Sequence, residues 1–193
     1  MKATASAFLA FSLVAGPATA QVPTLSAPSA DLHQPVVRQY TLEDLSNIEA
    51  IKRLKARYFR MLDTKQWEEW GKIFAPDAIM RVTSDNSITG WSRGNNQPQE
   101  VVGRQNIVAR VSQTHAHTLT VHHGHMPEIE LTSPTTARGV WAMEDMSDTD
   151  SQKSHGWGHY EETYELVGGR WYIKTLRLTR LRLEETRTTP PKH

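Results

Sequence analysis

Cysteine is absent from the 193 residues of the chain, so disulfide bonds cannot support the fold. A protein of this kind relies on its hydrophobic core, and the length suits one domain with a sizeable core. An excess of either charge is lacking too, because 22 lysines and arginines stand against 21 aspartates and glutamates. This balance argues against a nucleic-acid partner. A glycine-rich phosphate loop and a G-x-S-x-G elbow are also missing, which argues against nucleotide binding and serine hydrolysis.

Long hydrophobic runs are scarce, and the one near the N-terminus is short. Lys2 precedes the apolar run 7–14, and Gly16-Pro17 ends it before the small-residue site Ala18-Thr19-Ala20. This pattern predicts a cleavable signal peptide at residues 1–20, since the run is too short to span a bilayer. We therefore expect a periplasmic or secreted protein with no membrane partner after cleavage.

The first half of the chain reads as a linker followed by helices. Residues 21–40 are rich in proline and small polar residues, as linkers are. Thr41 and Asp44 form a capping-box pattern that predicts a helix to about Leu62. Its buried stripe recurs at steps of three and four residues: Ile51, Leu54, Tyr58 and Leu62 follow Ile48.

The pattern next predicts a short helix over 67–74 that ends at Ala75-Pro76-Asp77, a strand over 78–83, a polar loop over 84–99 and a helix over 100–112. Strands are predicted over 118–131, 136–146, 155–166 and 170–183, with a break or bulge at Pro127, a turn at Gly168-Gly169 and a tail over 185–193. The predicted helices lie in the first half of the chain and an antiparallel meander lies in the second half. This order predicts an α+β fold with helices on one face of a curved sheet.

Two motifs add a family resemblance. The first is Ile51-x6-Tyr58-x4-Asp63-x3-Trp67-x6-Phe74-Ala75-x-Asp77-Ala78, and the second is Tyr160-x3-Tyr164-x4-Gly169-Arg170-Trp171-x-Ile173. In this order they resemble the SnoaL-like domains of the nuclear transport factor 2-like superfamily, over a domain of residues 41–184. The resemblance implies a cone-shaped, strongly curved antiparallel sheet wrapped around a pocket and closed by the N-terminal helices. It also implies a homodimer or other homo-oligomer.

The resemblance also implies catalytic residues. Dehydratases of the superfamily pair an aspartate with a histidine, and the matching positions here are Asp63 and His122. An aspartate fixes the tautomer of a histidine, which then transfers protons near neutral pH. His123 is the alternative, because neighbouring strand residues face opposite ways and only one of the two can enter the cone. Tyr58 and Asp145 match the spacing of a second dehydratase.

The remaining predicted site residues lie on strands or beside them. His155 matches a second catalytic histidine of the family, and alternation places it on one face with Trp157. The substrate pocket is predicted from apolar side chains at the matching positions, namely Trp141, Met143, Trp157, Leu62 and Val82. These residues indicate a flat, largely apolar substrate, although core packing explains many of them equally well.

A metal site is the competing interpretation, because five of nine histidines lie between 115 and 125. The zincin spacing H-E-x-x-H is absent, however, and alternation separates His122 from His123. We therefore predict no metal and no cofactor.

Together these features predict a cofactor-independent lyase acting on a small hydroxylated, aromatic or polycyclic compound. His122, oriented by Asp63, takes a proton, and His155 or Tyr58 donates one. The products would be water or formaldehyde. An isomerase with the same pocket, a non-catalytic ligand carrier and an interaction module are the alternatives, because the fold alone does not decide function.

Overall fold

The computed structural model describes residues 39–82 and 99–188. The predicted signal peptide, residues 21–38 of the linker, the loop 83–98 and residues 189–193 of the tail lie outside this part. Within the described residues, every helix is too short or too polar to cross a membrane.

The first helix, α1 (Leu42–Asp63), begins where the sequence predicts. The Thr41 hydroxyl accepts a hydrogen bond from the backbone N–H of Asp44 at 3.1 Å, and the Asp44 carboxylate accepts the Thr41 N–H at 2.9 Å. This reciprocal pair is the predicted capping box. The helix buries its predicted stripe, and that stripe also contains Lys55.

Two predicted boundaries are wrong after α1. The helix α2 (Trp67–Gly71) is shorter than predicted, and the strand β1 (Phe74–Val82) already includes Pro76. Proline is tolerated there because the pairing of β1 with β6 is irregular between Phe74 and Ile79. Residues predicted as the start of a third helix form the strand β2 (Gln99–Val102), which pairs with β1.

Gly103 separates β2 from the helix α3 (Arg104–His115), which runs three residues beyond its predicted end. Its φ of 91° lies in a region that side chains disfavour, so glycine makes this strand-to-helix corner possible.

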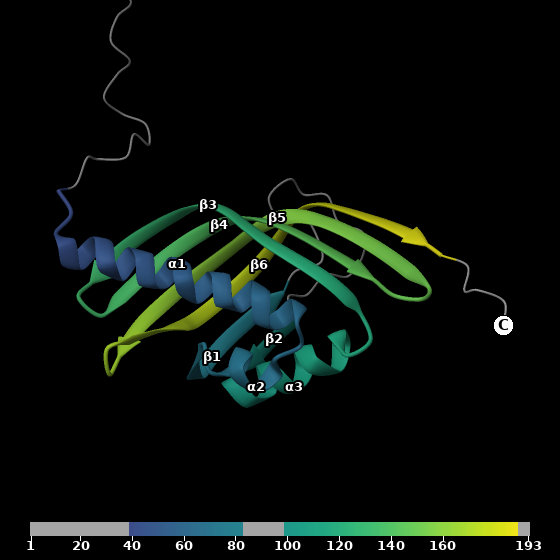
Figure 1. Ribbon diagram of the computed structural model, residues 1–193, viewed down its shortest axis with the longest axis horizontal. Helices are drawn as coiled ribbons and strands as arrows, with labels where there is room; N and C mark the ends of the chain where they lie inside the picture. The colour runs from purple at the N-terminus through teal and green to yellow at the C-terminus, as the bar shows by residue number, and fades with distance from the viewer. Residues whose placement is uncertain (1–38, 83–98, 189–193) are drawn as a thin grey trace, which may run out of the picture. The chain divides into compact units, whose positions relative to one another are not determined.

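Four long strands complete the chain: β3 (Leu119–Ser133), β4 (Thr136–Asp148), β5 (Gln152–Val167) and β6 (Arg170–Arg187). They form one six-stranded sheet in the order β2-β1-β6-β5-β4-β3. The sheet is open, with β2 and β3 at its edges, and α1 lies across one face (Figure 1). The predicted α+β class is correct. Among the described strands, the sheet is antiparallel at every pairing except one, because β1 runs parallel to β6.

Local features of the strands agree with the sequence in two places and differ in one. The pairing of β3 shifts between His125 and Glu128, which is the irregularity predicted at Pro127. Gly168 and Gly169 both have positive φ in the turn before β6, as expected. The tail was predicted from residue 185, but β6 continues to Arg187 and pairs there with the start of β5.

We call the sheet face covered by α1 the inner face and the opposite one the outer face. Phe59 of α1 is the side chain that a Cβ at Gly124 would meet, which places Gly124 and its alternate neighbour His122 on the inner face. The inner-face residues of β4 and β5 are buried: Ala137, Trp141, Met143 and Asp145 on β4, and Gly156, Gly158, Tyr160, Glu162 and Tyr164 on β5.

Candidate active site

Asp63 and His122 are joined by two hydrogen bonds at the end of α1. The His122 Nδ1 lies 2.6 Å from one oxygen of Asp63, and the His122 backbone N–H donates to the other at 2.9 Å. The His122 side chain is only 9% exposed and that of Asp63 is 21% exposed. The structure thus brings together the two residues that the resemblance paired, which we call the Asp63–His122 dyad.

The dyad forms because α1 approaches β3 closely. A Cβ on Gly124 would lie 2.5 Å from the ring of Phe59, so only glycine allows this ring to reach the strand. Asp63 is the last residue of α1 and therefore sits where the helix ends beside His122. The choice between neighbouring histidines is decided by the same packing, since the His123 side chain is 48% exposed on the outer face.

Partial burial favours a higher pKa for the Asp63 carboxyl, but hydrogen bonds from the ring and backbone of His122 hold its pKa below the ordinary value. Asp63 is therefore ionised at neutral pH and can only accept hydrogen bonds. The proton between the two groups consequently belongs to Nδ1 of His122. This tautomer leaves Nε2 with the lone pair that a general base needs.

Two further residues hold the carboxylate in place. The Thr120 hydroxyl donates to the same Asp63 oxygen as His122 Nδ1, at 3.0 Å, and Lys65 Nζ donates to the Thr120 hydroxyl at 2.8 Å. Thr120 is buried, so this hydroxyl is a fixed support for the dyad.

Asp145 lies beside the dyad, since it faces His122 directly across the β3–β4 pair. Its two oxygens accept hydrogen bonds from Nη1 and Nη2 of Arg180 at 2.5 and 2.7 Å, and the pair is largely buried. Gly156 makes room for it, because a Cβ there would lie 1.8 Å from Arg180 Nη1. The structure thus places the predicted site residue Asp145 beside the dyad, paired with an arginine that sequence reasoning missed.

His115, the last residue of α3, is the second residue missed at this place. Its ring centre lies 6.3 Å from that of His122. Burial lowers the pKa of His115 below its ordinary value, although the hydrogen bond with the Val111 carbonyl opposes this effect. The imidazole is therefore neutral at neutral pH. Its Nδ1 lies 3.1 Å from the backbone carbonyl of Val111, which only accepts, so Nδ1 carries the proton and Nε2 is an acceptor. The only sequence signal was its membership of the histidine-rich segment.

Most of the predicted pocket residues lie in the hydrophobic core. Tyr58 is buried against the rings of Tyr160, Trp70 and Phe74. Burial, with the charges of Glu162 and Asp145, raises the pKa of Tyr58 far above its ordinary value. Tyr58 therefore stays protonated and can act only as a hydrogen-bond or proton donor.

The predicted pocket residues on the inner side are buried too. They are Leu62, Trp141 and Met143. Val82 differs, because it is 39% exposed at the end of β1.

The structure does not bring His155 and Trp157 to the dyad. Alternation correctly placed both on one face, but it is the outer face, on the opposite side of the sheet from His122. His155 Nε2 donates a hydrogen bond to a carboxylate oxygen of Glu144 at 2.7 Å, and the centre of its ring lies 3.9 Å from that of Trp157. A proton donor on this side cannot serve a base on the other.

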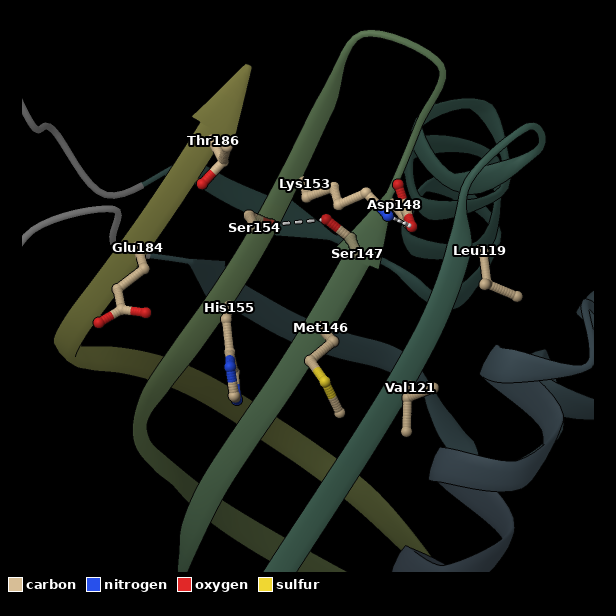
Figure 2. Close-up of a pocket in the computed structure, with 10 residues that line it drawn as sticks. All are labelled: Leu119, Val121, Met146, Ser147, Asp148, Lys153, Ser154, His155, Glu184 and Thr186. Atoms are coloured by element: carbon tan, nitrogen blue, oxygen red, sulfur yellow. Dashed lines mark hydrogen bonds and ion pairs between the residues drawn. The ribbon is translucent and has the colours of Figure 1, made fainter. Parts of the chain in front are cut away.

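The outer face has a hollow of its own, of about 320 Å³, near the ends of the long strands. His155, Met146 and Val121 lie side by side across β5, β4 and β3 at its floor (Figure 2). The Asp63–His122 dyad does not line this hollow.

A buried ionic network lies on the inner side, and sequence reasoning missed it as well. Lys55 Nζ donates to one oxygen of Glu162, and the Tyr164 hydroxyl donates to the other. Lys55 Nζ also lies 3.6 Å from the centre of the Tyr160 ring. Burial lowers the pKa of Lys55 to about 8, against the opposing effect of Glu162. The signal in the sequence was a lysine in the apolar stripe of α1.

The sequence and the fold were both compared with those of known proteins. Residues 43–177 match the SnoaL-like domain family. The chain belongs to this family. The SnoaL-like chain is 26% identical over 143 residues to the probable cyclase FGR4 of Gibberella zeae, a match that covers 68% of the chain and 89% of that protein.

Solved structures of similar fold include two named for elimination reactions. A scytalone dehydratase-like protein of Novosphingobium aromaticivorans has a TM-score of 0.64 at 18% identity, covering 77% of this chain and 93% of that one. A hexachlorocyclohexane dehydrochlorinase, LinA type 2, has a TM-score of 0.63 at 16% identity, covering 79% and 97%. These structures establish the nuclear transport factor 2-like fold of the SnoaL-like chain. The relatives together suggest small-molecule lyase- or isomerase-type activity.

Proposed function

We propose that the protein is a lyase that eliminates water or formaldehyde from a small hydroxylated, aromatic or polycyclic compound without a cofactor. The observation that carries this proposal is the Asp63–His122 dyad, in which an ionised carboxylate holds the imidazole with Nε2 free to accept a proton. The names of the two related structures, a dehydratase and a dehydrochlorinase, support elimination as the reaction class.

In the dehydration, His122 Nε2 takes a proton from the carbon next to the one that carries the hydroxyl. The electrons of that C–H bond form the double bond as the C–O bond breaks, and the departing hydroxide takes a proton to become water. Asp63 stabilises the imidazolium that forms in between. The step therefore needs only the substrate, one side chain that accepts a proton and one that donates a proton.

Formaldehyde release uses the same groups. His122 takes the proton of a hydroxymethyl O–H, the adjacent C–C bond breaks, and the carbon left behind takes a proton. Isomerisation differs only in that the proton returns to another carbon of the same molecule.

The geometry requires a different proton donor from the His155 that the sequence indicated. His155 is replaced in this role, because it lies on the outer face. We propose Tyr58 as the donor, since its hydroxyl is protonated at neutral pH and it lies on the inner side. The positive charge of Arg180 would stabilise negative charge on the substrate, although Asp145 offsets part of it.

Two parts of the proposal rest on the sequence. The signal-peptide pattern at residues 1–20 supports a periplasmic or secreted protein. The family resemblance supports a homodimer or other homo-oligomer with a small-molecule substrate.

The test is to incubate the purified protein with a panel of hydroxylated aromatic and polycyclic compounds. Mass spectrometry would detect loss of water or formaldehyde, and chromatography would detect isomers of unchanged mass. His122→Asn should lower turnover by about a hundred- to ten-thousand-fold, because a positioned acid or base contributes about that much. His117→Asn is the matched control, since His117 is an exposed histidine nearby in the sequence.

Loss of turnover in His122→Asn alone would support the proposal, and equal turnover in both variants would refute it. If compounds bind equally to all three proteins and none is converted, the protein is a carrier.

A further inference from the structure

Three side chains on the outer face present metal-binding atoms to one another. They are His123, His125 and Glu144, and one ligand atom from each lies within 4.8 Å of the other two. All three are at least partly exposed, so the atoms are open to solvent. This cluster is separate from the Asp63–His122 dyad, which lies on the other side of the sheet.

The strand geometry explains the cluster. His123 and His125 are two residues apart on β3, so both side chains leave the same face, while Gly124 between them faces α1. Glu144 lies directly opposite His123 on β4. Side chains at such cross-strand positions are close neighbours, and the three residues therefore form a triangle.

Glu144 is held in position by a fourth residue. His155 Nε2 lies 2.7 Å from one carboxylate oxygen, while the other oxygen lies 3.8 Å from His123 Nδ1 and 3.9 Å from His125 Nε2. One oxygen of Glu144 is thus hydrogen-bonded to His155, and the other faces the imidazoles of His123 and His125. A hydrogen bond of this kind orients a ligating carboxylate.

We propose that His123, His125 and Glu144 bind one divalent transition-metal ion of the zinc class on the outer face, with His155 as a positioning residue. Two imidazoles and one carboxylate are a donor set that zinc accepts, with water in the open position. Ligand bonds of about 2.0–2.2 Å require the donor atoms to approach to about 3.4 Å of one another. The observed separations need only small side-chain rotations to reach this.

This proposal replaces the prediction that the chain binds no metal. The sequence showed the histidines but gave no reason to add Glu144, which lies 19 to 21 positions further along the chain. Only the pairing of β3 with β4 brings it to them.

The test is calorimetric titration of the purified protein, free of any polyhistidine tag, with zinc chloride. We expect one Zn²⁺ per chain. Substituting His125→Asn or Glu144→Gln should abolish this binding, because each removes a ligand. His155→Gln should weaken it by about ten- to a hundred-fold, as is typical when a group that supports a ligand is lost. Binding should also weaken at acid pH, because imidazole must be neutral to bind a metal.

Substitution of Co²⁺ provides a second readout, since its visible spectrum reports the coordination geometry and disappears with the ligands. His122→Asn is the control that separates the two faces, and it should retain full zinc affinity. The proposal is overturned if the protein binds no zinc, or if binding survives His125→Asn and is lost in His122→Asn. Because the readout is metal binding, these outcomes are independent of whether the protein is a lyase.

Discussion

The substitution Asp63→Asn tests the dyad with the smallest change in shape. Asp63 accepts three hydrogen bonds, from the ring and the backbone of His122 and from the Thr120 hydroxyl. An asparagine has one accepting oxygen and one donating amide group. In either orientation of the amide, its N–H₂ faces a group that also donates.

The two orientations have different consequences. If the amide nitrogen faces the ring of His122, the ring must place its proton on Nε2, and the general base is lost. If it faces the backbone N–H of His122, a partly buried donor loses its partner, at a cost of about 1–3 kcal/mol. We therefore expect turnover to fall by about a hundred- to ten-thousand-fold and the free energy of unfolding to fall by about 1–3 kcal/mol.

Nitrogen NMR of the His122 ring measures the tautomer directly and needs no substrate. The native protein should show the proton on Nδ1, and Asp63→Asn should show an increased population with the proton on Nε2. The reasoning is refuted if the variant keeps the native tautomer, native turnover and native stability together.

The pH dependence gives an independent check on the same residue. The pKa of Asp63 is depressed in the folded state, so its contribution to stability is present above the pKa of the unfolded chain, about 3.9. That contribution is lost as the pH falls through the folded-state value. In urea unfolding, the difference between native protein and Asp63→Asn should therefore be full at pH 7 and shrink in strong acid. A difference that stays constant would contradict this account.

Four further predictions concern Lys55, Gly156 and Trp157. Replacing Lys55 with methionine should destabilise the protein by about 3–5 kcal/mol, because Glu162 is left buried without its cation, and Lys55→Met with Glu162→Gln should recover part of the loss in urea unfolding. Since burial lowers the pKa of Lys55 to about 8, the native protein should gain stability as the pH rises from 8 toward 10.5, and the double variant should lack this slope. Gly156→Ala should lower the melting temperature, because the added methyl group displaces Arg180 from its carboxylate, and an unchanged value would refute that reading of the contact. Trp157→Leu should leave turnover unchanged in the compound panel, and a loss of activity there would mean that the substrate binds the outer face.

The sequence alone determined the elements whose signals are local. The capping box at Thr41, the stripe of α1 and the glycine turn at Gly168 depend on neighbouring residues, and all three are confirmed. The pairing of Asp63 with His122 came from a family resemblance, and the structure places the two in contact. Boundaries failed where a long-range partner decides them, as at β2, whose pairing with β1 converts a predicted helix into a strand.

The faces of the sheet could be decided only by tertiary structure. Alternation shows that residues two apart share a face, and it grouped His155 with Trp157 correctly. It does not show which face a helix will cover. The family motif held a signal for the face. Tyr160 is buried against Tyr58 of α1, Tyr164 is buried as well, and both lie at even positions, so the odd-numbered His155 faces the other side.

The contacts between polar side chains also depend on segments that are distant in the sequence. Arg180 reaches Asp145 from another strand across Gly156, and Glu144 reaches His123 across the β3–β4 pair. The sequence determined which chemical groups are present, but strand register and the packing of α1 decided which of them meet. Register is a property of pairing between distant segments, whereas a helix cap or a glycine turn forms from residues that are adjacent in the chain.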